Sequence, residues 1–471
     1  MASQSEQKPT APPSASPVAT AVDDLDALLA AVLPEASKIN GLVRLSGGAS
    51  RETWRFVADG RPLVVQLQRA GDERDMMVEA AVVKAAGAAG VPAPSMIASG
   101  RQTDGGAFMV VDAIDGETIA RKIQRDDDFI DARRTFARRC GAALARVHAI
   151  DHADISGLIQ EDQIERYTDV LDELGEPHPA FELARNWLLA NRPAPTRTCL
   201  VHGDFRLGNL IVDSDGLRAV IDWELAHLGD PMEDLGWLCV KAWRFGGAHD
   251  VGGIGERNEL FASYEAAGGD PVDPDAVHWW EVLGTWKWGI MCIVQADAHR
   301  SGRARSHELA AIGRRVCENE YDLLDPVGLN LFDLDPGQVT DPAGAEPTNW
   351  ESGPHDLPNA PELLQAVSEW IGRDVVETAA AAGDSRLRFH ARVAMNVLAT
   401  VERELFHGPV HAQRHRARLA GLGAESDREL ADMIRAGIDD ERTVEVATAV
   451  HAGVLDKLAV ANPKYASRAP G

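Results

Sequence analysis

The segment 200–238 constrains the fold more than any other part of the chain, because it spaces three oxygen ligands around a short hairpin. Asp204 is followed five residues later by Asn209, and Asp222 ends an apolar run. The tight turn Asp213–Gly216 predicts two antiparallel strands that would bring Asn209 and Asp222 together. These strands would cover Leu210–Val212 and Leu217–Ile221.

Metal-dependent phosphoryl transfer uses this set of side chains. A loop carboxylate such as Asp204 can accept the proton of an incoming hydroxyl. The amide oxygen of Asn209 and the carboxylate of Asp222 are hard ligands that suit Mg²⁺. Asp and Asn also gather in turns for backbone reasons, and Asp213–Gly216 is such a turn. The hypothesis is therefore a catalytic site of Asp204, Asn209 and Asp222, with Asn209 and Asp222 binding the metal.

The motifs HGDxxxxN, IDWE and GDPxxDLG follow one another here and resemble the aminoglycoside phosphotransferase/choline kinase superfamily. The resemblance covers about residues 25–326. It implies a protein-kinase-like bilobal α+β fold, with an antiparallel sheet in the N-lobe and a helical C-lobe, and ATP and Mg²⁺ as cofactors. It also implies that Asp204 is the catalytic base.

The same resemblance assigns supporting roles to four further residues. His202 would order the catalytic loop, and Glu224 would assist at the metal through water. Asp230 and Asp234 would brace the loop and the helix that follows it.

Residues 42–68 predict three strands joined by two turns. The first turn is glycine-rich, so its backbone can approach a polyphosphate and direct N–H groups at it. It comprises Ser46, Gly47, Gly48, Ala49 and Ser50. The backbone from Val111 to Ala113, at the expected hinge between the lobes, should meet the adenine edge.

The third strand should carry a cation that clamps the phosphates, but the best alignment places Gln66 there. An amide donates hydrogen bonds without charge. Either Arg69, just beyond the strand, reaches in, or the metal neutralises more of the charge, or nucleotide affinity is weak. Glu79, in the predicted helix Met76–Ala89, would at best hydrogen-bond to Gln66 instead of forming an ion pair.

A long helix is predicted over Val277–Gly302. One apolar stripe predicts core packing and consists of Trp279, Leu283, Trp286 and Ile290. The other side carries Trp280, Lys287 and Arg303. This side either lines the acceptor pocket, where Lys287 or Arg303 would meet an anionic substrate, or faces solvent.

The net charge of −26 argues against nucleic-acid binding, which needs a basic footprint. It fits either a preference for cationic substrates or plain solubility. No apolar run reaches the roughly 18 residues of a membrane span, and the first 20 residues lack the apolar core of a secretory signal. The five cysteines form no CxxC pair, so a cytoplasmic protein is expected.

We expect four parts along the chain. They are a disordered tail over 1–22, a kinase-like domain over 23–325 with lobes at about 23–112 and 113–325, a Pro/Gly/Asp-rich linker over 326–356 and an all-helical domain over 357–467. Periodicity predicts five helices in the last part. They are Glu362–Ala381, Leu387–Leu405, Ala412–Gly421, Ser426–Ala436 and Arg442–Val460.

The segments FHARVAMNVLATVEREL and VLDKLAVANPKY resemble a family of small helical bacterial proteins that are often encoded beside such kinases. They carry no nucleophile–base pair and no metal spacing, so a structural or specificity-setting role is expected. The basic run Gln413–Arg418 either binds a CoA phosphate or is an ordinary helix face.

The kinase-like half most resembles domains attached to, or encoded beside, acyl-CoA dehydrogenases. This resemblance implies phosphorylation of a small-molecule hydroxyl, in a hydroxyacyl-CoA of the 4-hydroxyacyl type, and a functional link to an acyl-CoA dehydrogenase. Two alternatives remain. An acidic acceptor pocket would favour an amino-alcohol or aminoglycoside kinase, and Gln66 would favour a pseudokinase scaffold.

Overall fold

The computed structural model describes residues 17–45, 51–68, 74–102, 105–325, 329–334 and 360–466, with the backbone alone for 17–24, 440 and 441. The glycine-rich turn Ser46–Ser50, Arg69 and most of the predicted linker lie outside these residues.

The N-lobe is built on an antiparallel sheet with the strand order β1-β2-β3-β5-β4. Leu25 and Leu29 of α1 pack against Trp54 on one face, while Met76 and its helix α2 cover the other face. The first helix begins at Pro17, inside the predicted tail. The elements are α1 (Pro17–Val32), β1 (Ile39–Arg44), β2 (Arg51–Ala58), β3 (Arg61–Gln68), α2 (Met76–Ala88), β4 (Met96–Arg101) and β5 (Ala107–Asp112).

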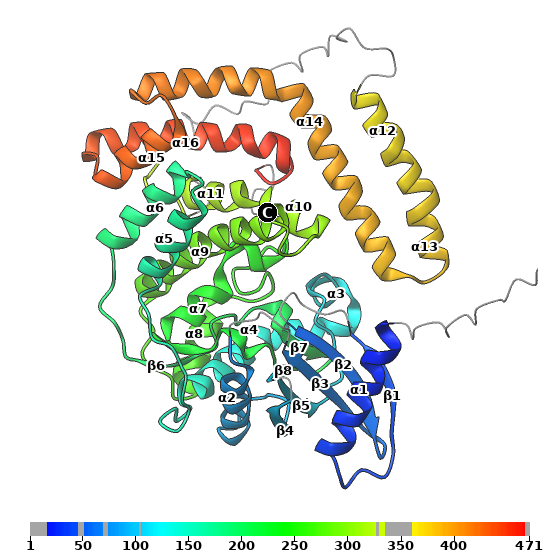
Figure 1. Cartoon of the computed structure of the whole chain (residues 1–471). Helices are drawn as coiled ribbons and strands as arrows, with labels where there is room; N and C mark the ends of the chain where they lie inside the picture. Colours follow the sequence, from blue (N-terminus) through cyan, green and yellow to red (C-terminus); the bar gives the residue numbers. More distant parts are fainter. Residues whose placement is uncertain are drawn as a thin grey trace, which may run out of the picture.

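The C-lobe is mainly helical, as predicted, and α9 runs through it (Figure 1). The predicted stripe of Trp279, Leu283, Trp286 and Ile290 is buried. The helices are α3 (Ala120–Arg125), α4 (Ile130–His148), α5 (Gln163–Leu174), α6 (Pro179–Ala190), α7 (Met232–Cys239), η4 (Lys241–Arg244), α8 (Arg257–Ala266), α9 (Pro274–Arg300), α10 (His307–Gly313) and α11 (Val316–Leu324).

The predicted hairpin is confirmed. β7 (Leu210–Asp213) pairs antiparallel with β8 (Gly216–Val220), and the Asp213 side chain accepts hydrogen bonds from the amides of the turn. Before and after the hairpin, β6 (Cys199–Val201) pairs with β9 (His227–Gly229). The two short sheets therefore hold the catalytic segment between the lobes.

The C-terminal part is helical as predicted, but it contains fewer breaks. The predicted helices Leu387–Leu405 and Ala412–Gly421 are one helix, α14 (Ser385–Leu422), which continues through Pro409. Pro409 bends this helix without ending it, because a proline lacks one hydrogen-bond donor and its ring crowds the carbonyl four residues earlier, and Figure 1 shows α14 bent. The other helices are α12 (Ala360–Trp370), a π-helical turn (Ile371–Val376), α13 (Glu377–Ala381), α15 (Asp427–Ala436) and α16 (Asp440–Ala461).

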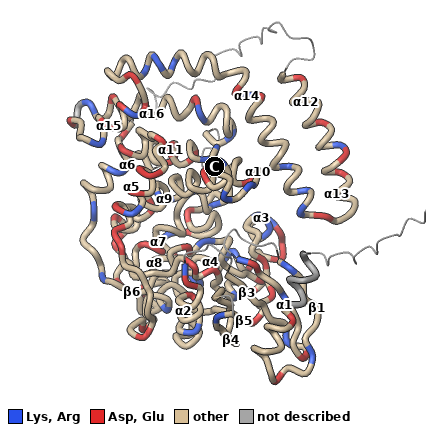
Figure 2. Tube along the Cα trace, in the orientation of Figure 1, with Lys and Arg blue, Asp and Glu red and all other residues tan. Residues whose placement is uncertain are grey.

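The C-terminal helices pack directly on the C-lobe (Figure 1). Leu419 and Ile434 belong to the same buried cluster as Phe181 and Trp286 of the C-lobe. Ion pairs also cross the junction, and they include Arg435 with Glu182, Lys457 with Glu320 and Arg314 with Glu404. Figure 2 shows both signs of charge on these helices. Among the described helices, none is both long and apolar enough to span a bilayer.

Glu320 makes this junction sensitive to acid. Burial alone would raise the pKa of Glu320, but Lys457 and His178 lower it to about 2. The unfolded carboxyl titrates near pH 4.3, so the folded state binds fewer protons and the stabilisation is complete above that pH. We predict that Glu320→Gln lowers the unfolding free energy at pH 7 by about 2–3 kcal/mol.

Urea unfolding at pH 7, 5 and 3.5 tests this prediction. The difference between wild type and Glu320→Gln should be equal at pH 7 and 5 and should shrink at 3.5, as the pH falls towards the folded pKa. Glu369→Gln, at an exposed position on α12, is the matched control and should change little. A difference that persisted unchanged at pH 3.5 would contradict the linkage to the pKa of Glu320.

Candidate active site

The catalytic loop follows β6 and approaches the loop after β8 very closely. Gly203 has a φ of +76°, and a Cβ on it would lie 2.4 Å from the Leu225 carbonyl oxygen. Only glycine accepts both the backbone conformation and the contact. The close approach holds Asp204, the next residue, facing the segment that carries Asp222.

The Asp204 carboxylate is held by three side chains. Oδ1 accepts hydrogen bonds from Trp237 Nε1 at 2.9 Å and from Arg206 Nε at 3.0 Å. Oδ2 accepts one from Asn209 Nδ2 at 2.6 Å. The three donors orient the carboxylate, as a positioned proton acceptor requires.

Buried polar groups beneath the loop fix its backbone. The Asp234 carboxylate accepts hydrogen bonds from the amides of His202 and Gly203, at 2.7 and 2.9 Å. Burial alone would raise the pKa of Asp234, but hydrogen bonds from His148 and from these amides lower it. Asp234 is therefore an ionised brace, and His148 is a structural residue, since it contacts both Asp234 and the Tyr264 hydroxyl.

His202 connects the two halves of the site. Its Nε2 lies 3.1 Å from the Ile221 carbonyl oxygen, and its Nδ1 accepts the Asp204 amide hydrogen at 3.2 Å. This pattern requires a neutral imidazole with the proton on Nε2. Burial lowers the pKa of His202, which agrees with that form.

The hairpin brings the two predicted metal ligands to one end of the site. The amide of Ile221 donates to the Asn209 carbonyl oxygen at 3.0 Å, so Asn209 lies across from the residue preceding Asp222. Asp222 has a φ of +66° and a ψ of +61°, a left-handed conformation that is uncommon outside glycine. Such backbone strain is concentrated at functional sites.

Arg51, the first residue of β2, is a buried cation surrounded by carboxylates. Its Nη1 lies 2.6 Å from Glu79 Oε1 and 4.0 Å from Asp222 Oδ1, and its Nη2 lies 3.0 Å from Glu224 Oε2. Glu79 therefore has a full ion pair, and the prediction that it could at best hydrogen-bond to Gln66 is wrong. β2 pairs with β3, and Arg51 stands opposite Gln68, so the neighbouring strand supplies the cation at that end of the sheet.

Gln66, the residue predicted at the clamp position, lies within β3. It pairs with Thr53 and Met109 across the sheet, and its side-chain oxygen is buried without a hydrogen-bond partner among the described residues.

Three carboxylates converge on Arg51, so the cluster carries an excess of negative charge. Burial raises the pKa of Asp222 to about 6, and the negative charge of Glu224 adds to this effect. Burial also raises the pKa of Glu79 to about 7, against the opposing charge of Arg51. A divalent cation beside Asp222 would relieve this repulsion, and the hard oxygen donors of Asp222 and Asn209 fit Mg²⁺.

A family model described as the phosphotransferase enzyme family matches residues 41–280, just over half of the 471 residues. The chain belongs to the phosphotransferase enzyme family. The matched region contains both the catalytic loop and the Arg51 cluster. A second model, described as a domain of unknown function (DUF6285), matches residues 381–465, which include α14, α15 and α16.

Individual relatives of this phosphotransferase match over shorter stretches. Mouse acyl-CoA dehydrogenase family member 10 is 48% identical over 64 residues, 13% of this chain and 6% of that protein. The "Probable acyl-CoA dehydrogenase IBR3" of Arabidopsis thaliana is 35% identical over 130 residues, 23% of this chain and 16% of that protein. This chain thus corresponds to only a small part of the length of these relatives.

Solved structures confirm the predicted fold. The crystal structure of a Ralstonia eutropha protein assigned as an aminoglycoside phosphotransferase aligns with a TM-score of 0.50 and 24% identity. The alignment covers 63% of this chain and 96% of that protein. This structure confirms the predicted fold class, and the family model confirms the predicted superfamily and enzyme class.

The structure also describes two further residues that were predicted to contact the nucleotide. Val111 is buried in β5, between Val64 and Met96. The amide of Ala113 already donates to the Pro62 carbonyl oxygen at 3.1 Å, which leaves its carbonyl for an adenine contact. The predicted flap Ser46–Ser50 lies outside the described residues.

Asp230 braces the start of α7, as expected. Its carboxylate accepts hydrogen bonds from the amides of Met232 and Thr196, at 2.9 and 2.6 Å. Burial raises the pKa of Asp230 above its usual value, because its effect is larger than that of these hydrogen bonds, which lower the pKa.

Sequence reasoning missed a cluster of aromatic side chains beside Asp204. We call this cluster of Trp237, Trp243 and Trp288 the aromatic wall. The Arg206 guanidinium lies 4.7 Å from the centre of the Trp243 ring, and Trp243 contacts Trp237 and Trp288. Trp243 follows the recognised motifs on η4, and Arg206 lies inside HGDxxxxN at a position the motif leaves open. The sequence feature that could have revealed the wall is the pair of closely spaced tryptophans after the catalytic loop, Trp237 and Trp243.

The three predicted substrate residues take different positions. Lys287 is only 4% exposed, hydrogen-bonds to Gln163 at 3.1 Å and lies 5.0 Å from the centre of the Trp237 ring. Lys287 is thus a buried cation beside Trp237, and its Nζ also lies 3.7 Å from Glu233 Oε1. Trp280 packs against Trp279. Arg303 lies in the exposed turn after α9, ion-paired with Asp297, and is not part of the wall.

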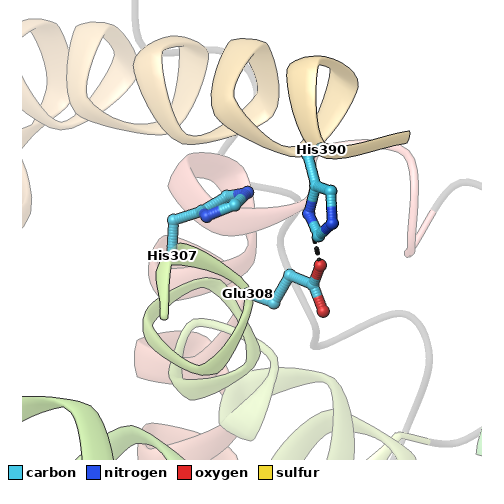
Figure 3. Close-up of side chains that lie close together, drawn as sticks. All are labelled: His307, Glu308 and His390. Carbon is cyan, nitrogen blue, oxygen red and sulfur yellow. Dashed lines mark ion pairs between the residues drawn. The ribbon is translucent and has the colours of Figure 1, made fainter. Parts of the chain in front are cut away.

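One other group of possible metal ligands occurs among the described residues, at the contact of α10 with α14 (Figure 3). It comprises His307, Glu308 and His390, and His390 Nδ1 lies 2.6 Å from Glu308 Oε1. The positive end of the α10 dipole and the guanidinium of Arg386, 3.5 Å from His390, both disfavour a cation. We interpret the group as an ion pair that fastens α14 to the C-lobe.

Proposed function

We propose that the enzyme uses ATP and Mg²⁺ to phosphorylate a hydroxyl of a small anionic molecule, most consistently a hydroxyacyl-CoA of the 4-hydroxyacyl type. The observation that carries the proposal is the Asp204 carboxylate, oriented by Trp237, Arg206 and Asn209 and facing the segment that carries Asp222. A base on one side and a metal-binding carboxylate on the other are the parts needed for phosphoryl transfer to a hydroxyl.

The step needs little covalent chemistry from the protein. Asp204 takes the proton of the acceptor hydroxyl while the hydroxyl oxygen bonds to the γ-phosphorus. The bond from that phosphorus to the β–γ bridging oxygen breaks, and ADP leaves with the electron pair. Bound Mg²⁺ supplies charge neutralisation on the phosphates. Asn209 and Asp222 would hold it, and Arg51 would hold Glu79 and Glu224 in place around it.

The acceptor side favours an anionic substrate over an amino sugar. Arg206 lies beside Asp204 and stacks on Trp243, so a cation and an apolar surface stand next to the base. An aminoglycoside kinase would be expected to present carboxylates there. The matches to acyl-CoA dehydrogenase family members support an acyl-CoA acceptor and a functional link to such a dehydrogenase.

An acceptor panel tests the substrate class. Purified enzyme with Mg²⁺ and ATP is offered 3- and 4-hydroxyacyl-CoAs, the free hydroxy acids, choline and an aminoglycoside, and ADP release is measured. We expect turnover with a hydroxyacyl-CoA. Turnover with choline or the aminoglycoside alone would overturn the proposed acceptor and leave the kinase assignment standing.

Asp222→Asn should remove most metal-dependent nucleotide binding. The substitution keeps the shape of the side chain but removes the charge that holds Mg²⁺, so we expect MgATP affinity to fall at least tenfold. Calorimetry with and without Mg²⁺ measures the effect. Asp215→Asn, at the exposed hairpin turn, is the matched control. Equal MgATP affinity in Asp222→Asn and wild type would exclude Asp222 as a metal ligand.

A further inference from the structure

A cavity of about 490 Å³ lies where the C-terminal helices meet the C-lobe. Its wall comes from the start of α6, from α10 and α11, and from α14, α15 and α16. Its described lining residues do not include Asp204, Asn209 or Asp222, so it is separate from the catalytic site. Small-molecule sites typically measure roughly 300–1,000 Å³.

Lys457 of α16 presents a donor to this cavity. Its Nζ lies 3.0 and 2.9 Å from the two carboxylate oxygens of Glu320, which is 1% exposed. The Lys457 side chain nevertheless keeps 49% of its surface exposed and lines the cavity. An ammonium group has three N–H donors, so the pair with Glu320 fixes Lys457 in position without using all of them.

His178, at the start of α6, adds positive charge beside Lys457. Its Nδ1 lies 2.9 Å from Glu320 Oε1. Its Nε2 is buried without a hydrogen-bond partner among the described residues, and the nearest carboxylate, that of Glu176, is 3.8 Å away. Burial alone would lower the pKa of His178, but the two carboxylates raise it, so the ring favours the doubly protonated form.

Arg418 of α14 is held in the same manner on another buried carboxylate. Its Nη2 lies 2.5 Å from Asp456 Oδ2, and Asp456 is 4% exposed. All five carboxylates among the described wall residues already have partners within the protein. Four are ion-paired, namely Glu176 with Arg300, Glu320 with Lys457, Glu404 with Arg314 and Asp456 with Arg418, and Asp427 lies 3.1 Å from His415 Nε2.

The rest of the wall is largely aliphatic. It includes Leu419, Leu422, Val450, Val454 and Val460, from α14 and α16. The cavity therefore combines an apolar surface with donors that are oriented by buried acids.

We propose that this cavity is a binding site for an amphipathic organic anion, with one acidic head group and an aliphatic body. The head group accepts a hydrogen bond from Lys457, and the body lies against the aliphatic residues of α14 and α16. An amine would find the carboxylates of the described wall already paired. The site is independent of the proposed acceptor of the kinase.

Calorimetric titration of the full-length protein with octanoate tests the proposal, with octylamine and 1-octanol as probes of equal chain length. Two cavity-filling variants locate the site. A Cβ added to Gly408 would meet no atom within 4 Å, and one added to Gly453 would meet only Arg418, at 3.8 Å, so leucine can extend into the cavity from either helix. Leucine is also the better helix former, so both variants should fold.

We expect octanoate to bind, and Gly408→Leu and Gly453→Leu to weaken that binding at least tenfold each. Gly421→Leu, on α14 and not among the lining residues, is the matched control and should bind as wild type does. Three results would each overturn the proposal. They are no binding of octanoate at millimolar concentration, binding of octylamine or 1-octanol as tight as that of octanoate, and octanoate binding that both filling variants retain.

Discussion

Asp204→Ala should lower kcat about 10³-fold while leaving the affinity for MgATP nearly unchanged. The loss corresponds to about 4 kcal/mol of transition-state stabilisation. The physical reason is that the carboxylate accepts the acceptor proton, whereas the phosphates are held by other groups. Steady-state kinetics with the best acceptor of the panel, together with calorimetry of MgATP, separates the two effects.

Asp204→Asn is the control that separates the base from its hydrogen bonds. Its side-chain oxygen can still accept from Trp237 Nε1, which donates at 2.9 Å in the wild type, but the amide cannot take a proton. We therefore expect Asp204→Asn to be about as slow as Asp204→Ala. If either variant kept wild-type turnover, Asp204 would not be the base.

Arg51→Met should destabilise the N-lobe by about 3 kcal/mol at pH 8, because it leaves Glu79 buried without a counter-ion. It should also weaken MgATP binding, since Glu79 and Glu224 lose the cation that positions them. The folded pKa of Glu79 already lies above its unfolded value, at about 7. The folded state therefore binds the extra proton, and the penalty for Arg51→Met should shrink as the pH is lowered from 8 to 6.

Arg55→Met is the matched control for that experiment. Arg55 lies on the same strand, but its ion pair with Asp115 is exposed. Removal of such a pair changes stability by less than about 1 kcal/mol. Urea unfolding of both variants at pH 6 and 8 measures the two losses of unfolding free energy and their dependence on pH. A cost of Arg51→Met that matched Arg55→Met, or did not vary with pH, would show that Arg51 is not the partner of a buried Glu79.

The sequence predicted those parts of the site that depend on local spacing. The hairpin between Asn209 and Asp222 followed from one turn and two short apolar runs, and the order of motifs indicated the fold. Local spacing could not identify Arg51, because its role depends on the pairing of β2 with β3 and on a contact with Glu224, 173 residues away along the chain. The local pattern therefore places the expected clamp on β3, at the uncharged Gln66. The buried cation that pairs with Glu79 instead comes from β2.

The aromatic wall was missed for a related reason. Trp237 and Trp243 look like ordinary core residues in the sequence, and both are buried. Only the fold reveals that Trp237 donates a hydrogen bond to Asp204 and that Arg206 stacks on Trp243. The helix carrying Lys287 was predicted correctly, but the direction of its polar side depends on α5 and α7, which no local pattern specifies.

The buried cluster shared by α14, α15 and the C-lobe has a consequence for how the two halves are made. A kinase part ended at Asp325 would expose the faces of α6 and α11 that α15 and α16 cover. Each half produced alone would expose apolar surface and tend to aggregate. Joining them in one polypeptide fixes a one-to-one stoichiometry and gives each half a high effective concentration of the other. Fusion therefore allows the two halves to assemble at low expression levels, at which the association of two separate chains would be limited by their concentration.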